Sequence, residues 1–299
     1  MSVYGEVEYL VTGASGALGG LTVKALLEEQ HVPASKIAAV SRTAESLSAF
    51  ADLGVQMRVA DFDLPETISA AFAGARNVLI VSTNDLGTGK RLAQHKNAVE
   101  AAKSVGVKHL FYTSLPDPET SHILFAPDHA GTEAAIKASG LAYTLLRNNW
   151  YAENLLMAVP GALASGKWYT AAGHGAVAYL GRAEYASAAA AALVRATEFV
   201  NATLTLTGAE ALTTEELAKK ISAATGKPLT VVPVPLDAIV EGLKQHGFPQ
   251  DVATVFASID TSVELGELAG ISTDFVTLTG RPQQPFDAWL AANVSLFLG

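Results

Sequence analysis

The sequence Val11-Thr12-Gly13-Ala14-Ser15-Gly16-Ala17-Leu18-Gly19 places three glycines at the spacing G-x-x-G-x-x-G. A short apolar run precedes them and a helical pattern follows, so they lie at a strand-to-helix turn. There Gly13 can allow a tight turn, Gly16 lets the backbone approach a pyrophosphate, and Gly19 permits close packing of helix on strand. Amides at the start of the helix would favour the phosphates, so the pattern predicts a dinucleotide-binding loop, with a plain structural turn as the alternative. The residues of this glycine loop are Gly13, Ser15, Gly16, Ala17, Leu18 and Gly19.

The glycine loop heads a series of alternating strands and helices. Six short apolar runs are separated by longer stretches of helical spacing, and the runs scarcely alternate between apolar and polar residues. Such strands are expected where helices cover both faces of a sheet. The first half of the chain therefore predicts a Rossmann-type α/β fold, a doubly wound parallel sheet with right-handed crossovers. The expected strands are Tyr9–Thr12, Ile37–Val40, Val55–Val59, Val78–Val81, Leu110–Thr113 and Tyr143–Leu146.

The rhythm of the sequence changes after about Asn149. Residues 161–179 are rich in glycine and aromatic side chains, and helical and strand-like segments then alternate to the end of the chain. Thr213 and Glu216 form a capping-box pattern, which predicts the start of a helix. We expect residues 1–150 to form a nucleotide-binding domain to which residues 182–207 return. Residues 151–299 are expected to form mainly a smaller α/β substrate lobe.

The composition excludes several classes of protein. Apolar residues make up 49% of the chain and charged residues 16%, which is typical of a compact globular protein. The net charge of −9 argues against nucleic acid as a partner, because phosphate binding requires a basic surface. No apolar run approaches the roughly 20 residues of a membrane span, and the chain has no cysteine. We expect a cytoplasmic protein without metal, nucleic acid or membrane partners, and the sequence leaves a homodimer open.

The end of the second expected strand distinguishes between two cofactors. Sites that prefer NAD usually carry an acidic residue there, which binds the ribose hydroxyls. This chain has Ser41-Arg42-Thr43 instead. The Arg42 guanidinium can pair with a 2′-phosphate, which predicts NADP(H) as the cofactor. A solvated arginine in a loop is the alternative.

Two further strand ends carry candidate cofactor residues. Asp61 and Phe62 follow the third strand, where a polar group and a ring could hold the adenine. Asp61 could equally cap the helix that starts near Pro65. Ser82-Thr83-Asn84 follows the fourth strand, at the edge where open parallel sheets bind ligands. Small polar residues are also common in loops that bind nothing.

These features form a connected pattern with four later segments. The segments are Tyr112-Thr113-Ser114-Leu115, His129-x-x-Thr132-Glu133, Tyr143-Thr144-Leu145-Leu146-Arg147-Asn148-Asn149-Trp150-Tyr151 and Leu278-Thr279-Gly280-Arg281-Pro282. With them the chain resembles the NmrA-like branch of the atypical short-chain dehydrogenase/reductases over nearly its whole length. The glycine motif is shared by many families, whereas the arginine–asparagine segment after the sixth strand is much more specific.

The resemblance implies an NADP(H) site and a substrate cleft between the nucleotide domain and the smaller lobe. The cofactor residues that it implies are those of the glycine loop together with Arg42, Asp61, Phe62, Ser82, Thr83, Asn84, Arg147, Asn148 and Asn149.

The chain departs from ordinary short-chain dehydrogenases at the proton donor. Where those carry Tyr-x-x-x-Lys it has Ala126-Pro127-Asp128-His129, so alcohol–ketone chemistry is disfavoured. His129 stands where related ether reductases have a catalytic lysine. It could orient the reactants or donate a proton, or it could simply satisfy nearby backbone groups. Tyr151 and Asn154, one helical turn apart, could face the cleft or serve only in packing.

The missing acid favours one class of reaction. Hydride transfer to a quinone puts negative charge on a delocalised oxygen, so positioning can supply much of the catalysis. We therefore expect an NADPH-dependent oxidoreductase acting on a quinone or similar conjugated small-molecule electron acceptor, with His129 and Tyr151 as the catalytic residues. The alternatives are a non-catalytic NADP(H)-sensing regulator and a specialised biosynthetic reductase, because a fold does not define its chemistry.

Overall fold

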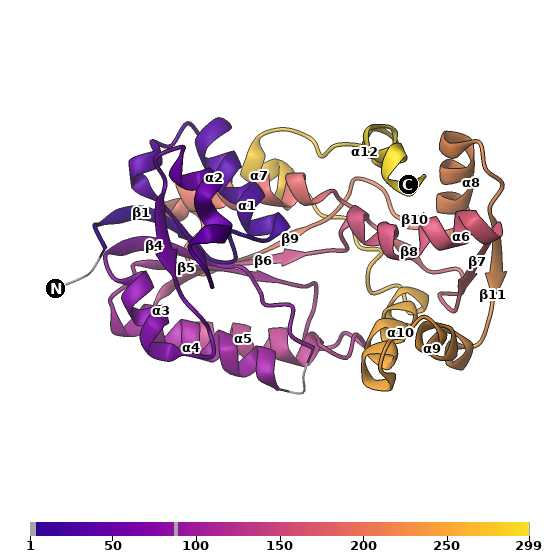
Figure 1. The fold of residues 1–299 in the computed structure, drawn as a ribbon, viewed down its shortest axis with the longest axis horizontal. Helices are drawn as coiled ribbons and strands as arrows, with labels where there is room; N and C mark the ends of the chain where they lie inside the picture. Colours follow the sequence, from indigo (N-terminus) through magenta and orange to yellow (C-terminus); the bar gives the residue numbers. More distant parts are fainter. Residues whose placement is uncertain (1–3, 87–88, 299) are drawn as a thin grey trace. The chain divides into compact units, whose positions relative to one another are not determined.

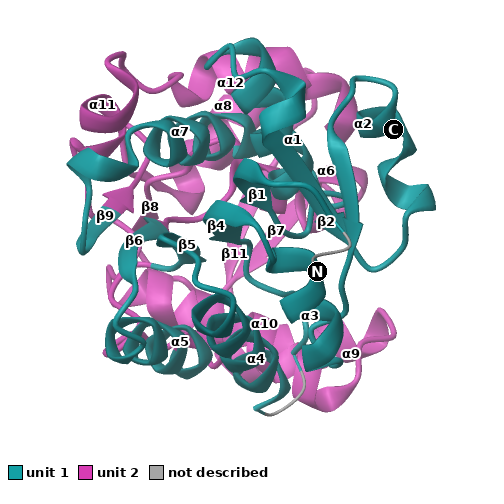
Figure 2. Cartoon of the chain, turned by 90° about the vertical axis from the view of Figure 1, so that its left-hand side faces the viewer, with its two compact units in different colours: residues 1–115, 127–147, 182–204 teal, residues 116–126, 148–181, 205–299 magenta. Residues whose placement is uncertain are grey.

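A computed structural model describes residues 4–86 and 89–298 (Figure 1). The chain divides into two compact units, which Figure 2 distinguishes by colour. Unit 1 consists of Met1–Leu115, Pro127–Arg147 and Arg182–Leu204, and unit 2 consists of Pro116–Ala126, Asn148–Gly181 and Thr205–Gly299. Residues 1–3 and 299 of the expected domains lie outside the described residues.

The central sheet of unit 1 has seven strands in the order β3-β2-β1-β4-β5-β6-β9. The five pairings from β3 across to β6 are all parallel. Every residue of β2 and of β5 is buried, which explains why the middle of each strand is an unbroken apolar run in sequence. The predicted Rossmann-type α/β fold is confirmed. The strands are β1 (Val7–Val11), β2 (Ile37–Ser41), β3 (Gln56–Val59), β4 (Ala75–Ile80), β5 (His109–Ser114), β6 (Ala142–Asn148) and β9 (Ala202–Leu206).

Helices cover both faces of this sheet. Figure 2 shows α1 and α7 on one face and α3, α4 and α5 on the other. Helix α7 carries a run of buried alanines, and their small side chains let it lie closely along α1. None of the helices formed by residues 4–86 and 89–298 is long and apolar enough to cross a membrane. The helices of unit 1 are α1 (Ala17–Glu28), α2 (Ser48–Ala51), α3 (Pro65–Phe72), α4 (Lys90–Ser104), α5 (Ala126–Ala138) and α7 (Arg182–Val194).

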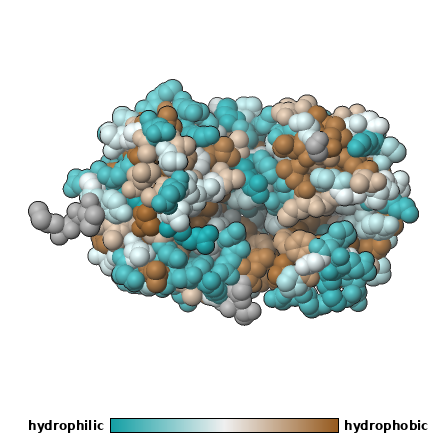
Figure 3. All heavy atoms as spheres, in the orientation of Figure 1, coloured by the Kyte–Doolittle hydropathy of each residue, from teal (hydrophilic) through white to brown (hydrophobic). Residues whose placement is uncertain are grey.

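Unit 2 contains two small sheets and several helices. Strand β7 (Lys167–Thr170) pairs in parallel with β11 (Thr230–Pro233), and β8 (Ala176–Val177) pairs antiparallel with β10 (Leu212–Thr213). Figure 3 shows hydrophobic residues gathered on the face of unit 2 around α12. The helices are α6 (Val159–Ser165), α8 (Thr214–Thr225), α9 (Leu236–Gln245), α10 (Gln250–Glu264), α11 (Asp274–Thr279) and α12 (Phe286–Asn293).

The predicted capping box at the start of α8 is confirmed. Thr213 Oγ1 accepts from the Glu216 backbone N–H at 3.2 Å. In return, Glu216 Oε2 accepts from the Thr213 backbone N–H at 2.9 Å. Helix α8 ends at Gly226, whose φ of +69° suits glycine.

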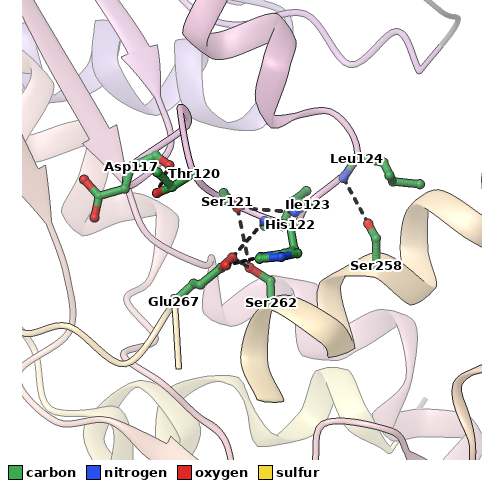
Figure 4. A network of polar contacts seen from close by, with 9 residues as sticks. All are labelled: Asp117, Thr120, Ser121, His122, Ile123, Leu124, Ser258, Ser262 and Glu267. Atoms are coloured by element: carbon green, nitrogen blue, oxygen red, sulfur yellow. Dashed lines mark hydrogen bonds and ion pairs between the residues drawn. The ribbon is translucent and has the colours of Figure 1, made fainter. Parts of the chain in front are cut away.

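Residues 116–126 belong to unit 2 although they join β5 to α5 of unit 1. Figure 4 shows how polar contacts hold this connector to α10 and the turn after it. The His122 backbone N–H donates to Glu267 Oε2 at 2.9 Å, and the His122 ring bonds the same carboxylate. The Leu124 backbone N–H donates to Ser258 Oγ at 3.1 Å. These bonds explain why the connector groups with unit 2.

Candidate functional site

The glycine loop has the geometry that its sequence predicts. Gly13 adopts a φ of +62°, which opens the turn after β1, and the Gly16 N–H donates to Gly13 O at 2.9 Å. A Cβ at Gly19 would lie 2.7 Å from the Gly13 carbonyl carbon and 2.8 Å from Thr12 O. Only glycine therefore allows α1 to approach the end of β1 so closely.

The loop presents backbone groups rather than long side chains. Gly13, Ser15, Gly16 and Ala17 are exposed, whereas Leu18 is buried in the core. No side chain caps α1 at its N-cap residue, Gly16. The first amides of α1 are therefore left to water or to an external acceptor, and the positive end of the helix dipole favours an anion there.

The end of β2 meets the glycine loop through serine hydroxyls. Ser41 Oγ donates to Ser15 Oγ at 2.8 Å, and Ser46 Oγ donates to Ser41 Oγ at 2.9 Å. Arg42 follows directly and is exposed, and no carboxylate within residues 4–86 and 89–298 pairs with it. A cation beside a helix N-terminus is suited to an anion with two phosphate positions.

Asp61 accepts hydrogen bonds within the loop between β3 and α3. Its Oδ1 accepts from the Asp63 backbone N–H at 2.9 Å, and its carbonyl accepts from the Leu64 N–H at 2.9 Å. The N-cap of α3 is Leu64, without a side-chain cap, so the alternative that Asp61 caps this helix is wrong. Phe62 is partly buried and packs against the core of unit 1. Contact of either residue with adenine stays a prediction.

The loop after β4 is held by hydrogen bonds from its backbone N–H groups to side chains of other elements. The Ser82 N–H donates to Thr113 Oγ1 at 2.9 Å, and the Thr83 N–H donates to His95 Nε2 at 3.0 Å. Ser82 and Thr83 are partly exposed, and Asn84 is exposed. The residue that holds Thr83, His95, was not singled out from the sequence, because only the fold brings α4 under this loop.

Arg147 is engaged in a buried ion pair within unit 1. Its Nε and Nη2 donate to the two Glu133 carboxylate oxygens at 3.0 and 2.8 Å. Ser114 Oγ also donates to Glu133, at 2.7 Å. The side chains of Arg147 and Glu133 are 11% and 1% exposed, so the pair joins β6 to α5 as a fixed element. A contact between Arg147 and the cofactor stays a prediction.

The two asparagines after β6 differ in their bonding. Both ends of the Asn149 amide are bonded: its Nδ2 donates to Leu268 O at 2.9 Å and its Oδ1 accepts from the Trp150 N–H at 2.8 Å. Asn148 Nδ2 donates to the Tyr151 hydroxyl at 3.3 Å. Asn148 Oδ1, by contrast, is buried and has no partner among the described residues. An unsatisfied buried carbonyl indicates a missing donor, so Asn148 is the better candidate for ligand binding.

His129 lies in a buried polar cluster of unit 1. Its ring is 4% exposed, with Nδ1 2.7 Å from the Tyr112 hydroxyl and Nε2 3.4 Å from Arg91 Nη1. Burial, the nearby Arg91 charge and the neighbouring His95 ring all lower the pKa of His129, well below its usual value. An unperturbed histidine has a pKa of about 6.5, so this ring is neutral near pH 7.

Tyr151 and Asn154 belong to unit 2 and lie just after β6 in the chain. Tyr151 is partly buried, and its backbone bridges to Leu180. Asn154 lines a cavity of about 980 Å³, whereas Tyr151 is not among the lining residues. The structure thus gives Asn154 the stronger case for substrate contact.

This cavity lies within unit 2, and six aromatic side chains are among the residues that line it. Asp260 also lines it, and Oδ2 of this residue accepts from the Ala171 N–H at 2.7 Å and from Thr170 Oγ1 at 3.2 Å. Burial raises the pKa of Asp260, although these two bonds favour the carboxylate. Residues 161–179, which are rich in glycine and aromatic side chains, supply part of the cavity lining, whereas no sequence pattern distinguishes Asp260 as a lining residue. The aromatic lining residues are Trp150, Trp168, Tyr169, Tyr179, Phe248 and Phe256.

The chain is similar to known proteins over most of its length. The chain is 36% identical over 272 residues to quinone oxidoreductase 2 of Escherichia coli, which covers 91% of this chain and 93% of that protein. Its fold matches triphenylmethane reductase of Citrobacter sp., crystallised with NADP(H), with a TM-score of 0.89 and 35% identity over 96% of this chain and all of that one. It matches the NADPH complex of the Escherichia coli quinone oxidoreductase equally well, with a TM-score of 0.89 and 35% identity over 97% of this chain and all of that one.

The glycine loop, the sheet order and the segment after β6 all lie within one matched region. The sequence model of the NmrA-like family matches residues 7–274, which is most of the chain. The chain therefore belongs to the NmrA-like family.

Proposed function

We propose that this chain is an NADPH-dependent oxidoreductase that transfers hydride to a quinone or a similar conjugated small-molecule acceptor. The observation that carries the proposal is the exposed glycine loop, with Ser15 bonded to Ser41 and, beside it, Arg42, which has no ion-pair partner among the described residues. The solved relatives that contain NADP(H) or NADPH, and the quinone and triphenylmethane reductases among them, support it.

The residues of this chain fit the cofactor at two separate places. The open amides at the start of α1 suit a pyrophosphate, and Arg42 suits a 2′-phosphate. Asn148 Oδ1, buried without a partner, suits an N–H donor such as a carboxamide. Bound NADPH would supply the hydride.

His129 and Tyr112 are poor proton donors in this structure. The neutral His129 is enclosed by Tyr112 and Arg91, and burial also raises the pKa of Tyr112. We therefore propose that His129 orients the neighbouring Tyr112 and Arg91 side chains. A reduced quinone would take its protons from water. A delocalised oxyanion product makes this feasible without a strong protein acid.

A second class of acceptor is favoured by Asp260. A carboxylate in an aromatic cavity stabilises a planar cation, both by charge and through the faces of the rings. Hydride transfer to a cationic acceptor gives a neutral product and requires no proton. Triarylmethane cations, which the name of the Citrobacter relative suggests, belong to this class.

The test is NADPH consumption by the purified chain with a panel of quinones and triarylmethane cations. We expect turnover of at least one class. Binding of NADPH without turnover of any acceptor would support the sensor alternative instead. Sedimentation of the same preparation decides whether the active species is a monomer or the homodimer that the sequence allows.

Asp260→Asn separates the two acceptor classes. It should lower kcat/KM for cations roughly tenfold while neutral quinones change little. Asp251→Asn is the matched control, because Asp251 is an exposed carboxylate on the same helix and does not line the cavity. Equal losses for both acceptor classes would contradict a charge-selective role of Asp260.

A further inference from the structure

Three consecutive backbone amides after β4 donate to side chains. In chain order, the N–H groups of residues 81, 82 and 83 donate to Thr12 Oγ1 at 3.0 Å, Thr113 Oγ1 at 2.9 Å and His95 Nε2 at 3.0 Å. All three acceptors are almost fully buried. Thr12 directly follows β1 and Thr113 belongs to β5, the two strands beside β4, whereas His95 reaches the loop from α4. The loop backbone thus has one fixed position, set by three side chains.

The hydrogen bonds of His95 have a single consistent direction. Its Nε2 accepts from Thr83, so the ring proton lies on Nδ1, which donates to Thr132 Oγ1 at 2.9 Å. Thr132 Oγ1 in turn donates to Asp128 O at 2.6 Å. This chain of bonds connects the loop after β4 to the first turns of α5.

The environment of His95 keeps Nε2 available as an acceptor. The ring is completely buried and packs edge-on against Tyr112, with ring centroids 5.3 Å apart. Burial and the nearby Arg91 guanidinium lower the pKa of His95 to about 3. The ring is therefore neutral near pH 7, so protonation of Nε2 does not compete with the bond from Thr83 there.

We propose that His95 is a positioning residue for the cofactor: it holds residues 82–84 where they can contact NADP(H), without touching the cofactor itself. This inference rests on the proposed function, since the loop lies at the carboxyl edge of a parallel sheet, where such ligands bind. The Thr83 N–H has no strand partner to replace His95. Loss of this acceptor leaves a partly buried amide to find another bond, and the loop shifts.

Two variants and one control test the role of His95. His95→Phe keeps the ring volume but removes the acceptor, and His95→Gln restores an acceptor oxygen at a similar reach. His109→Phe is the matched control, because His109 is also buried in unit 1 and is bonded to a threonine, with Nε2 2.8 Å from Thr144 Oγ1. It makes no bond to the loop after β4.

Two measurements report separately on the hydrogen bonding of the loop and on the binding of the cofactor. Hydrogen exchange of peptides covering residues 81–86, without cofactor, should be roughly tenfold faster in His95→Phe. Calorimetry should give an NADPH Kd raised roughly tenfold in the same variant, with the KM of the acceptor unchanged. His95→Gln should recover most of both losses. His109→Phe should lower Tm without changing either quantity.

The outcomes separate this inference from the proposed function. Unchanged loop exchange in His95→Phe would overturn it, and so would fast exchange with an unaltered NADPH affinity. The same loss in His109→Phe would also overturn it, because the effect would then reflect general destabilisation. If the wild-type chain does not bind NADPH at all, the proposed function fails, and loop exchange still decides whether His95 fixes the loop.

Discussion

The polar residues of the candidate site fall into two groups. Some have side chains that are bonded within the protein, and others keep polar groups that the described residues do not satisfy. Arg147 is committed to Glu133, and Asn149 to Leu268 and Trp150. Arg42 is exposed without an ion-pair partner among the described residues, and Asn148 keeps an unsatisfied carbonyl. Polar groups that the protein does not satisfy are the better candidates for ligand contacts, because leaving them unpaired carries a cost that binding removes.

Arg42→Ala should change cofactor selectivity. The variant loses a charge-assisted contact to the 2′-phosphate, worth about 1.5–3 kcal/mol, so NADPH should bind roughly tenfold to a hundredfold more weakly. NADH lacks that phosphate and should bind nearly as before. Calorimetry with both cofactors measures the difference, and an equal loss for NADPH and NADH would contradict the assignment.

Gly16→Val should abolish cofactor binding in a folded protein. Gly16 has a φ of −87°, which any residue can adopt, and its Cβ would lie 3.2 Å from Gly13 O. The fold should therefore survive with a modest loss of stability, while the branched side chain blocks the loop surface. Circular dichroism checks the fold and calorimetry checks NADPH binding. Unchanged NADPH affinity would place the cofactor elsewhere.

Elements are joined by a few polar contacts whose strength depends on pH. The connector 116–126 is held by Glu267, which bonds the His122 backbone and ring and the Ser262 hydroxyl (Figure 4). Partial burial by itself raises the pKa of Glu267, but the bonds from Ser262 and His122 outweigh it and the pKa is lowered. The carboxylate form therefore contributes to the stability of unit 2.

Glu267→Gln should destabilise the protein by about 1 kcal/mol near pH 7. A lowered carboxyl pKa stabilises above the unfolded value and loses that contribution as pH falls through the folded value. The difference between wild type and variant should accordingly shrink below about pH 4. Urea unfolding across this range measures it. A difference that stays constant with pH would show that the charge of Glu267 has no part in holding the connector.

At the scale of the whole molecule, three buried histidines should make the protein sensitive to acid. The rings of His95, His109 and His129 are at most 4% exposed, and all belong to unit 1. Burial lowers the pKa of His95 to about 3 and that of His109 to about 4, and it lowers that of His129 as well. Unfolded histidine takes up a proton near pH 6.5, so stability falls as the pH drops below that value.

His109→Phe should remove the contribution of one buried histidine to the pH dependence of stability. Each neutral buried histidine costs about 1.4 kcal/mol for every pH unit below 6.5, or about 2 kcal/mol at pH 5. The variant should therefore be less stable than wild type at pH 7 but regain about 2 kcal/mol relative to it at pH 5. Denaturant unfolding at the two pH values provides the comparison. A parallel loss of stability in both proteins would contradict the burial of a neutral His109.

The sequence by itself determined the features that depend on neighbouring residues. The glycine turn, the strand-and-helix alternation and the Thr213–Glu216 capping box are each encoded within a few positions, and each is confirmed. A φ preference, a hydrophobic period or a reciprocal cap is a short-range property, so it can be read without knowing the fold.

Only the tertiary structure decided what each polar side chain does. His129 is buried against Tyr112, Arg147 is paired with Glu133, and Asp260 lines an aromatic cavity. These residues occur in the sequence as plausible site groups or as ordinary charges. Their partners lie many positions away along the chain, and burial, which sets both their pKa values and their availability to a ligand, exists only after the elements pack together.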